Sequence, residues 1–76
     1  MKLDLRRVKA ERIACGLTQE EVTKRMGRKD RAWYAKRENG IVPIGADDLI
    51  KLALIFGYTK DQLGIFFTEN VPEKER

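Results

Sequence analysis

The chain has 76 residues, enough for one small domain with a single core and too few for a second domain with a site of its own. One cysteine, Cys15, excludes an internal disulfide, and the absence of histidine removes the commonest metal ligand and general base. The formal net charge of +4 makes an anionic partner the first class to consider.

The composition also argues against a catalytic or membrane protein. The chain has no serine and no histidine, so it offers no nucleophile–base set, and we expect neither an enzyme nor a bound cofactor or metal. The first residues lack the apolar run of a signal peptide, and no apolar stretch approaches the length of a membrane span. We therefore expect a cytoplasmic protein with no membrane partner.

Residues 3–15 are predicted to form the first helix. Its core-facing side carries a charged residue among apolar ones: Leu5, Val8, Arg12 and Ile13. Burying the charge of Arg12 on this side costs free energy unless a carboxylate pairs with it. Alternatively, its apolar stem lies on the core while its guanidinium group reaches water. Cys15 is predicted to be a small buried apolar residue at the end of the helix.

The second helix is predicted at residues 18–26. Thr18 and Glu21 have the spacing of a capping box, in which each side chain accepts a hydrogen bond from the backbone of the other residue. Gly27 follows where a left-handed residue is needed to end the helix.

The third helix is predicted at about residues 31–39, with Asp30 as its N-cap and the Asn39-Gly40 pair as its end. Basic residues concentrate in and just before it. Residues 24–37 hold seven of them against a single acid: Lys24, Arg25, Arg28, Lys29, Arg31, Lys36 and Arg37. Such a patch is typical of a polyanion binder, with a solvated cationic face as the alternative.

Two more helices are predicted, at residues 46–56 and from Thr59 onward, where Gln62 completes a second capping box. The last one ends on Phe66 and Phe67. Because two adjacent phenylalanines of a short helix cannot both face one core, we predict that one or both are buried at a two-fold dimer interface. Residues 68–76 are predicted to be a flexible polar tail, which leaves 1–67 as the domain.

This pattern resembles the helix-turn-helix family of phage repressors, the lambda-repressor and Cro-like proteins also called the XRE family. Three segments carry the resemblance, which covers about residues 5–66: Leu17-Thr18-Gln19-Glu20-Glu21, Gly27, and Glu38-Asn39-Gly40. It implies an all-α, five-helix lambda-repressor-like DNA-binding domain, with the helix-turn-helix at residues 18–39 and an ion pair between Arg12 and Glu38. The stretch from Gly27 to Gly40 is one residue longer than the family pattern, which leaves the register of the third helix open by one position.

The resemblance places the third helix in the major groove of double-stranded DNA. Counting back from Glu38, Arg31 can bind guanine, Ala32 can touch a thymine methyl group, and Lys36 can bind either a guanine or a phosphate. Trp33 either contacts the DNA or folds over the second helix as core, and Gln19 either contacts DNA or faces water. The implied DNA-binding residues are Gln19, Arg28, Lys29, Asp30, Arg31, Ala32, Trp33, Lys36 and Asn39.

Two functions follow from the resemblance. The first is a phage or prophage repressor, a Cro-like transcription regulator that binds a pseudo-palindromic operator as a homodimer. The second is an antitoxin-type module that binds a toxin and autoregulates its operon, with Phe66 and Phe67 as its interaction surface. A tail that neutralises a partner should contain an extended apolar segment, and residues 68–76 do not, which favours the repressor.

Overall fold

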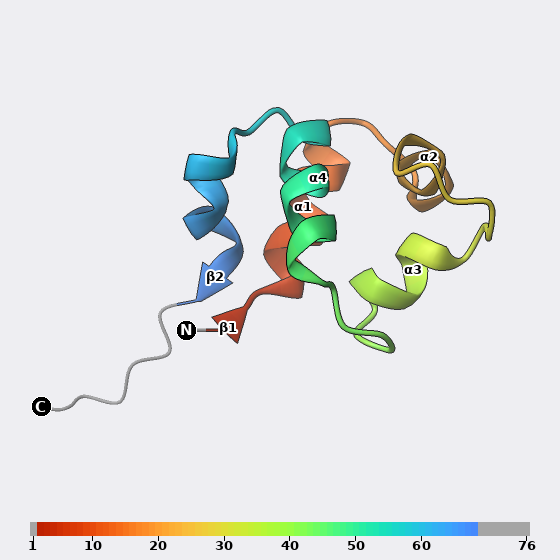
Figure 1. The fold of residues 1–76 in the computed structure, drawn as a ribbon, viewed down its shortest axis with the longest axis horizontal. Helices are drawn as coiled ribbons and strands as arrows, with labels where there is room; N and C mark the ends of the chain where they lie inside the picture. Colours follow the sequence, from red (N-terminus) through yellow and green to blue (C-terminus); the bar gives the residue numbers. More distant parts are fainter. Residues whose placement is uncertain (1, 69–76) are drawn as a thin grey trace, which may run out of the picture.

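The computed structural model describes residues 2–68, and these form a mostly helical domain (Figure 1). The elements in chain order are β1 (Lys2–Leu3), α1 (Leu5–Ala14), α2 (Gln19–Arg25), α3 (Trp33–Glu38), α4 (Ala46–Ile55), the 3₁₀ helix η1 (Lys60–Phe66) and β2 (Phe67–Thr68). The predicted all-α class with five helices is confirmed, and the strand pair is the addition. Helices α2 and α3 lie at one end of the molecule, and the two strands lie at the other (Figure 1). Within the described range, every helix is too short or too polar to cross a lipid bilayer.

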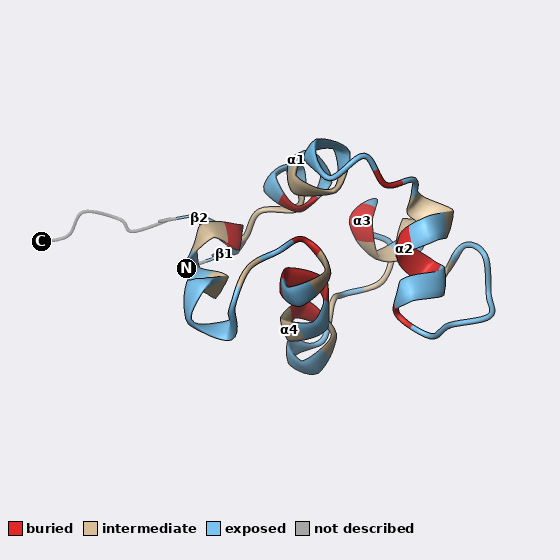
Figure 2. Cartoon of the chain, turned by 90° about the horizontal axis from the view of Figure 1, so that it is seen from above, coloured by how far each residue is buried: buried red, intermediate tan, exposed pale blue. Residues whose placement is uncertain are grey.

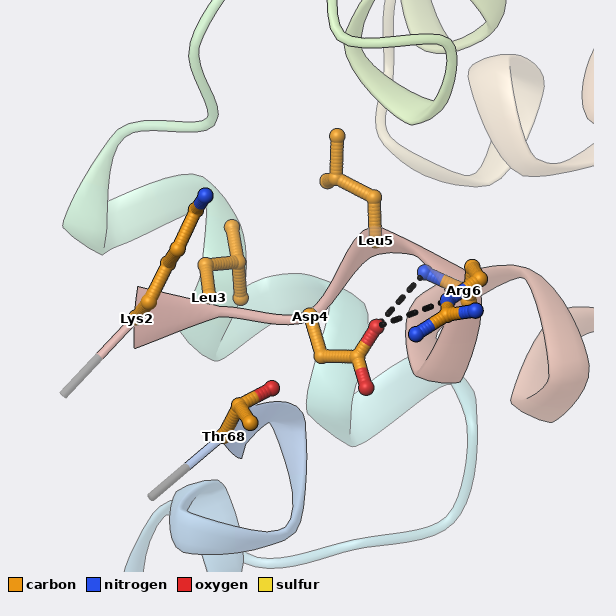
Figure 3. A pocket seen from close by; sticks show the side chains of 6 residues that line it. All are labelled: Lys2, Leu3, Asp4, Leu5, Arg6 and Thr68. Atoms are coloured by element: carbon orange, nitrogen blue, oxygen red, sulfur yellow. Dashed lines mark hydrogen bonds and ion pairs between the residues drawn. The ribbon is translucent and has the colours of Figure 1, made fainter. Parts of the chain in front are cut away.

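Helix α1 begins at Leu5, two residues later than predicted, because Asp4 caps it. The Asp4 carboxylate accepts hydrogen bonds from the backbone N–H groups of Arg6 at 3.0 Å and Arg7 at 3.4 Å. Figure 3 shows this carboxylate turned toward Arg6, beside the pocket that β1 and Thr68 help to line. Lys2 and Leu3 lie outside the helix because they pair with the other end of the chain.

Strands β1 and β2 are antiparallel, with Lys2 opposite Thr68 and Leu3 opposite Phe67. The backbone N–H of Asp4 extends this contact by donating to the Phe66 carbonyl at 2.7 Å. Thr68 therefore belongs to the folded domain and not to the predicted tail, whose residues 69–76 lie outside the described range. Two-residue strands are too short to leave an alternating pattern in the sequence.

The core lies between the helices, whose buried residues face the middle of the molecule in Figure 2. Its members come from α1, α2, α3, α4 and η1 and from the segments next to them: Val8, Leu17, Val22, Met26, Tyr34, Leu49, Leu52, Ala53, Phe56 and Phe66. In the helix predicted at residues 46–56, the apolar residues Leu49, Leu52, Ala53 and Phe56 are buried, and Gly57 follows with a φ of +93°, a left-handed conformation that commonly ends a helix.

Phe66 is 0% exposed in the single chain, so its prediction as a dimer-interface residue is wrong. The premise fails because the two phenylalanines belong to different elements: η1 ends at Phe66, and Phe67 is extended in β2. Phe66 can therefore point into the core while Phe67, which is half-buried, packs against the outside of that core. The interface prediction reduces to Phe67.

The end of α1 is more exposed than predicted. Ile13 lies about 140° around the helix from the buried Val8, five residues earlier, and faces solvent. Cys15 caps the helix and is also exposed, with its Sγ 3.6 Å from the Phe56 carbonyl oxygen. The prediction of a buried Cys15 is wrong because Val8 is the last apolar residue of α1 that reaches the core, and Cys15 follows the helix on its exposed side.

Candidate nucleic-acid interface

Helix α2 begins with the predicted capping box. Thr18 Oγ1 accepts from the Glu21 backbone N–H at 3.0 Å, and Glu21 Oε1 accepts from the Thr18 backbone N–H at 2.8 Å. The helix ends at Arg25 with Met26 as its C-cap, and Gly27 follows with a φ of +76°. Both ends of α2 are therefore set by local sequence.

Glu38, at the end of α3, is the centre of a buried hydrogen-bond network that joins three helices. It forms the ion pair with Arg12 that the resemblance implies: Arg12 Nε lies 2.8 Å from Oε1, and Nη2 lies 3.3 Å from Oε2. The Tyr34 hydroxyl donates to Oε1 at 2.7 Å, and Gln19 Nε2 donates to Oε2 at 2.7 Å. The side chains of Arg12 and Glu38 are 12% and 2% exposed, so the pair is shielded from solvent.

This network also sets the protonation states at its centre. Burial by itself raises the pKa of Glu38, but the hydrogen bonds from Arg12, Tyr34 and Gln19 outweigh it, and the pKa lies below its ordinary value. Burial, reinforced by Glu38, raises the pKa of the Tyr34 hydroxyl, which keeps its proton for the hydrogen bond. The network thus stabilises an ionised carboxylate inside the domain and fixes the end of α3 against α1 and α2.

The resemblance did not imply the contacts of Gln19 and Tyr34 with Glu38. Tyr34 precedes Glu38 by four residues on one helix, a spacing that places side chains together, and this signal was available in the sequence. Gln19 comes from α2 and carried no such signal. Its amide nitrogen is bound to Glu38, which ties the start of α2 to the end of α3.

Helix α3 begins at Trp33, so the predicted start at Arg31 and the predicted N-cap at Asp30 are wrong. Asp30 instead shapes the turn before the helix: its Oδ1 accepts from the Ala32 backbone N–H at 3.1 Å, and its carbonyl accepts from Trp33 at 2.9 Å. Residues 28–32 lie outside the helix, so the long stretch between Gly27 and Gly40 is accommodated in the turn.

Most of the predicted DNA-binding residues are exposed on the turn and on α3: Arg28, Lys29, Asp30, Arg31, Ala32, Lys36 and Asn39. Two of the basic ones lie near acids of the same surface. Arg31 Nε is 3.5 Å from Glu20 Oε2, and Lys36 Nζ is 3.6 Å from Asp30 Oδ2. Exposed pairs of this kind contribute only about 0–1 kcal/mol each, so they leave both basic side chains free to exchange partners.

Trp33 is half-buried and packs against the core, which the sequence left open. Two guanidinium groups lie over its ring: the Cζ atoms of Arg28 and Arg37 are 4.7 Å and 4.0 Å from the ring centroid. Arg28 also reaches α4, where its Nη2 is 3.5 Å from Asp48 Oδ1. Arg37 was predicted only as part of the basic patch, although its position four residues after Trp33 on a helix indicates a contact between the two side chains.

The exposed side chains of this surface are those of a polyanion-binding face, with guanidinium and ammonium groups carried on a turn and a helix. Within residues 2–68, no group of three cysteine or acidic side chains is placed to hold a metal ion.

A model of the family described as helix-turn-helix matches residues 8–63, from the middle of α1 to η1. No curated protein and no solved structure matches the chain.

Proposed function

Because the chain belongs to the XRE-type helix-turn-helix family, whose members are DNA-binding regulators, we propose that it is a sequence-specific repressor of the phage or prophage kind. In this proposal α3 enters the major groove of double-stranded DNA. The observation that carries the proposal is the exposed basic surface of the turn and α3, held in place by the buried network around Glu38.

The roles of the exposed residues follow from their positions. Arg31 and Ala32 precede the first turn of α3 and Lys36 lies one turn along it, so we assign these three to base edges. Lys24 lies in the last turn of α2 and is exposed, so we assign it to the phosphate backbone. Phosphate contacts position the protein, whereas base contacts select the sequence.

Selection of bound duplexes from a random DNA pool, at a stated salt concentration, tests the proposal. We expect one enriched motif made of two half-sites with approximate two-fold symmetry. A pool that yields no enriched motif would contradict the repressor and would favour the alternative, an antitoxin-type module whose main partner is a toxin.

Replacement of Arg31 by alanine is expected to weaken binding to the selected operator by about 1–3 kcal/mol and to relax base preference at one position per half-site. Quantitative binding assays on the operator and its single-base variants measure both effects. Lys24→Ala is the matched control: it should weaken operator and random DNA alike and reduce the salt slope by about one unit. If Arg31→Ala acts uniformly while Lys29→Ala alters base preference, the assigned register of the turn is wrong.

We further propose that the protein binds its operator as a homodimer and that Phe67 contributes to the interface. Phe67 is half-buried in β2 and extends the apolar surface beyond the core. A Phe67→Glu protein is expected to sediment as a monomer at concentrations where the wild type dimerises, because a carboxylate cannot be buried unpaired. Circular dichroism checks that the variant is folded.

Leu54→Glu is the control for this prediction, since Leu54 is an apolar residue of α4 that is 60% exposed. If Leu54→Glu dissociates the dimer and Phe67→Glu does not, the interface lies on α4.

A further inference from the structure

The start of α3 has no cap of its own. Ala32 precedes the helix and offers no side-chain hydrogen bond, and the helix has only six residues. A helix this short is not stable by itself, so contacts with the rest of the protein must hold it. The Glu38 network holds the C-terminal end of α3. The N-terminal end of α3 must therefore be held by other contacts.

Besides the hydrogen bonds that Asp30 accepts from Ala32 and Trp33, two further contacts are made there. The Tyr34 backbone N–H donates to Thr23 Oγ1 of α2 at 3.2 Å in a buried position. The second contact is a group that we call the Trp33 cluster: Trp33, Arg28, Arg37 and Asp48. Its members come from the turn, from α3 and from α4, so the cluster joins three parts of the chain.

Within the cluster, Arg37 is held by Trp33 and not by an acid. Its Nη1 donates to the Trp33 carbonyl at 2.8 Å, and its guanidinium group lies 4.0 Å from the ring centroid. Its Nε atom is buried and has no hydrogen-bond partner among the described residues. Burying a guanidinium N–H without an acceptor costs free energy, and the contact with the π face of Trp33 offsets part of this cost. Arg37 and the Trp33 ring therefore hold each other in place.

Arg28 connects the same ring to α4. Its guanidinium group lies over Trp33 and within 3.5 Å of the Asp48 carboxylate, in the first turn of α4. Its backbone N–H donates to the Thr23 carbonyl at 3.1 Å, which fixes the main chain just after Gly27. The Arg28 side chain, which the family resemblance assigned to DNA, is 45% exposed and has two partners within the protein, the Trp33 ring and the Asp48 carboxylate.

We propose that Arg28 is a positioning residue for DNA recognition, which acts through the Trp33 ring and the Asp48 carboxylate. Arg28 sets sequence preference without contacting a base. This inference rests on the proposed function. Arg31 and Ala32, two of the three residues assigned to base edges, lie in the turn between Arg28 and Trp33. A shift of the turn therefore moves them relative to the bases, whose hydrogen bonds tolerate little displacement.

Asp48→Asn is the decisive variant because the two roles of Arg28 predict opposite results. If Arg28 were a DNA contact, removing its carboxylate partner would release it and strengthen binding to every duplex. If Arg28 positions the turn, the ratio of operator affinity to random-DNA affinity falls, by about tenfold for the loss of one anchored cation–π contact. Asp47→Asn is the matched control, since Asp47 lies beside Asp48 in the same turn and is exposed, and within residues 2–68 it has no ion pair.

A second readout needs no DNA. Trp33 is the single tryptophan of the chain, so its emission and its quenching by acrylamide report on the cluster alone. Asp48→Asn and Arg28→Ala should raise the quenching constant, and Asp47→Asn should leave it unchanged. Trp33→Phe, which keeps a π face, should retain the affinity ratio, whereas Trp33→Leu should lose it. Melting curves verify that each full-length variant is folded.

Three outcomes separate the possibilities. A lower affinity ratio for Asp48→Asn than for Asp47→Asn, together with a ratio that Trp33→Phe retains and Trp33→Leu loses, supports the inference. Equal changes for both aspartate variants on operator and random DNA overturn it and leave the proposed function standing. If the wild type selects no motif from the random pool, the proposed function fails and this inference fails with it.

Discussion

Glu38→Ala is expected to lower the free energy of unfolding by about 3–5 kcal/mol, because it leaves the guanidinium group of Arg12 buried without its partner. Arg12 keeps one acceptor, the Leu17 carbonyl, and loses both bonds to the carboxylate. Arg12→Ala should cost a similar amount, since it leaves the carboxylate without its cation. Urea unfolding near neutral pH, followed by circular dichroism, measures both losses.

The controls for this prediction use an exposed acid and an isostere. Glu20→Ala removes a carboxylate that is exposed at its pair with Arg31 and should change stability by less than about 0.5 kcal/mol. Glu38→Gln keeps the shape of the side chain and should fall between the two. If Glu38→Ala and Arg12→Ala both match Glu20→Ala, the buried pair does not stabilise the domain.

The lowered pKa of Glu38 makes part of this stability depend on pH. A carboxyl with a lower pKa in the folded state than in the unfolded chain contributes fully above the unfolded value of about 4.3. The contribution is lost as the pH falls through the folded pKa, because the unfolded chain then binds the proton first. The stability difference between wild type and Glu38→Gln should therefore shrink as the pH falls below about 4.

Phe66→Ala is expected to destabilise the domain by about 3–5 kcal/mol, because it removes a completely buried ring. The ring packs against Phe56 and Tyr58, with centroid distances of 6.4 Å and 6.0 Å. A domain of this size has a total stability of about 5–15 kcal/mol, so a large part of it would be lost. Thermal and urea unfolding measure the change.

Phe66→Leu fills most of the same space and should cost less than the alanine variant. The assignment of Phe66 to the core would be wrong if Phe66→Ala kept the wild-type melting curve and shifted only the monomer–dimer distribution in sedimentation.

The sequence predicted best the features that depend on short spacings. Thr18 and Glu21 are three residues apart and form their capping box from local geometry alone. Arg12 stood out because a charged residue on an apolar face needs a partner, and the family resemblance supplied Glu38. The five helices were also predicted from local signals, the spacing of apolar residues and the residues that can begin or end a helix, although the bounds of α1 and α3 differ from the predicted ones.

The features that the sequence missed depend on contacts between distant residues. Asp30 has the chemistry of an N-cap, but the longer turn uses its carboxylate before the helix begins. Phe66 and Phe67 were predicted to belong to the apolar end of one helix, because no local signal indicates that the helix ends at Phe66 and that the chain is extended from Phe67. The contact of Gln19 with Glu38 spans 19 residues, and that of Arg28 with Asp48 joins a turn to another helix.

The pairing of β1 with β2 brings the two ends of the described domain next to each other. Residues 2 and 68 lie side by side, at the end of the molecule away from α2 and α3 (Figure 1). A label or a second protein fused at either place would therefore project away from the candidate interface. If the protein were attached to a surface through Lys2, the basic turn would face away from that surface. The same closeness makes the domain suited to circular permutation, because a short linker can join 68 to 2 without disturbing the helices.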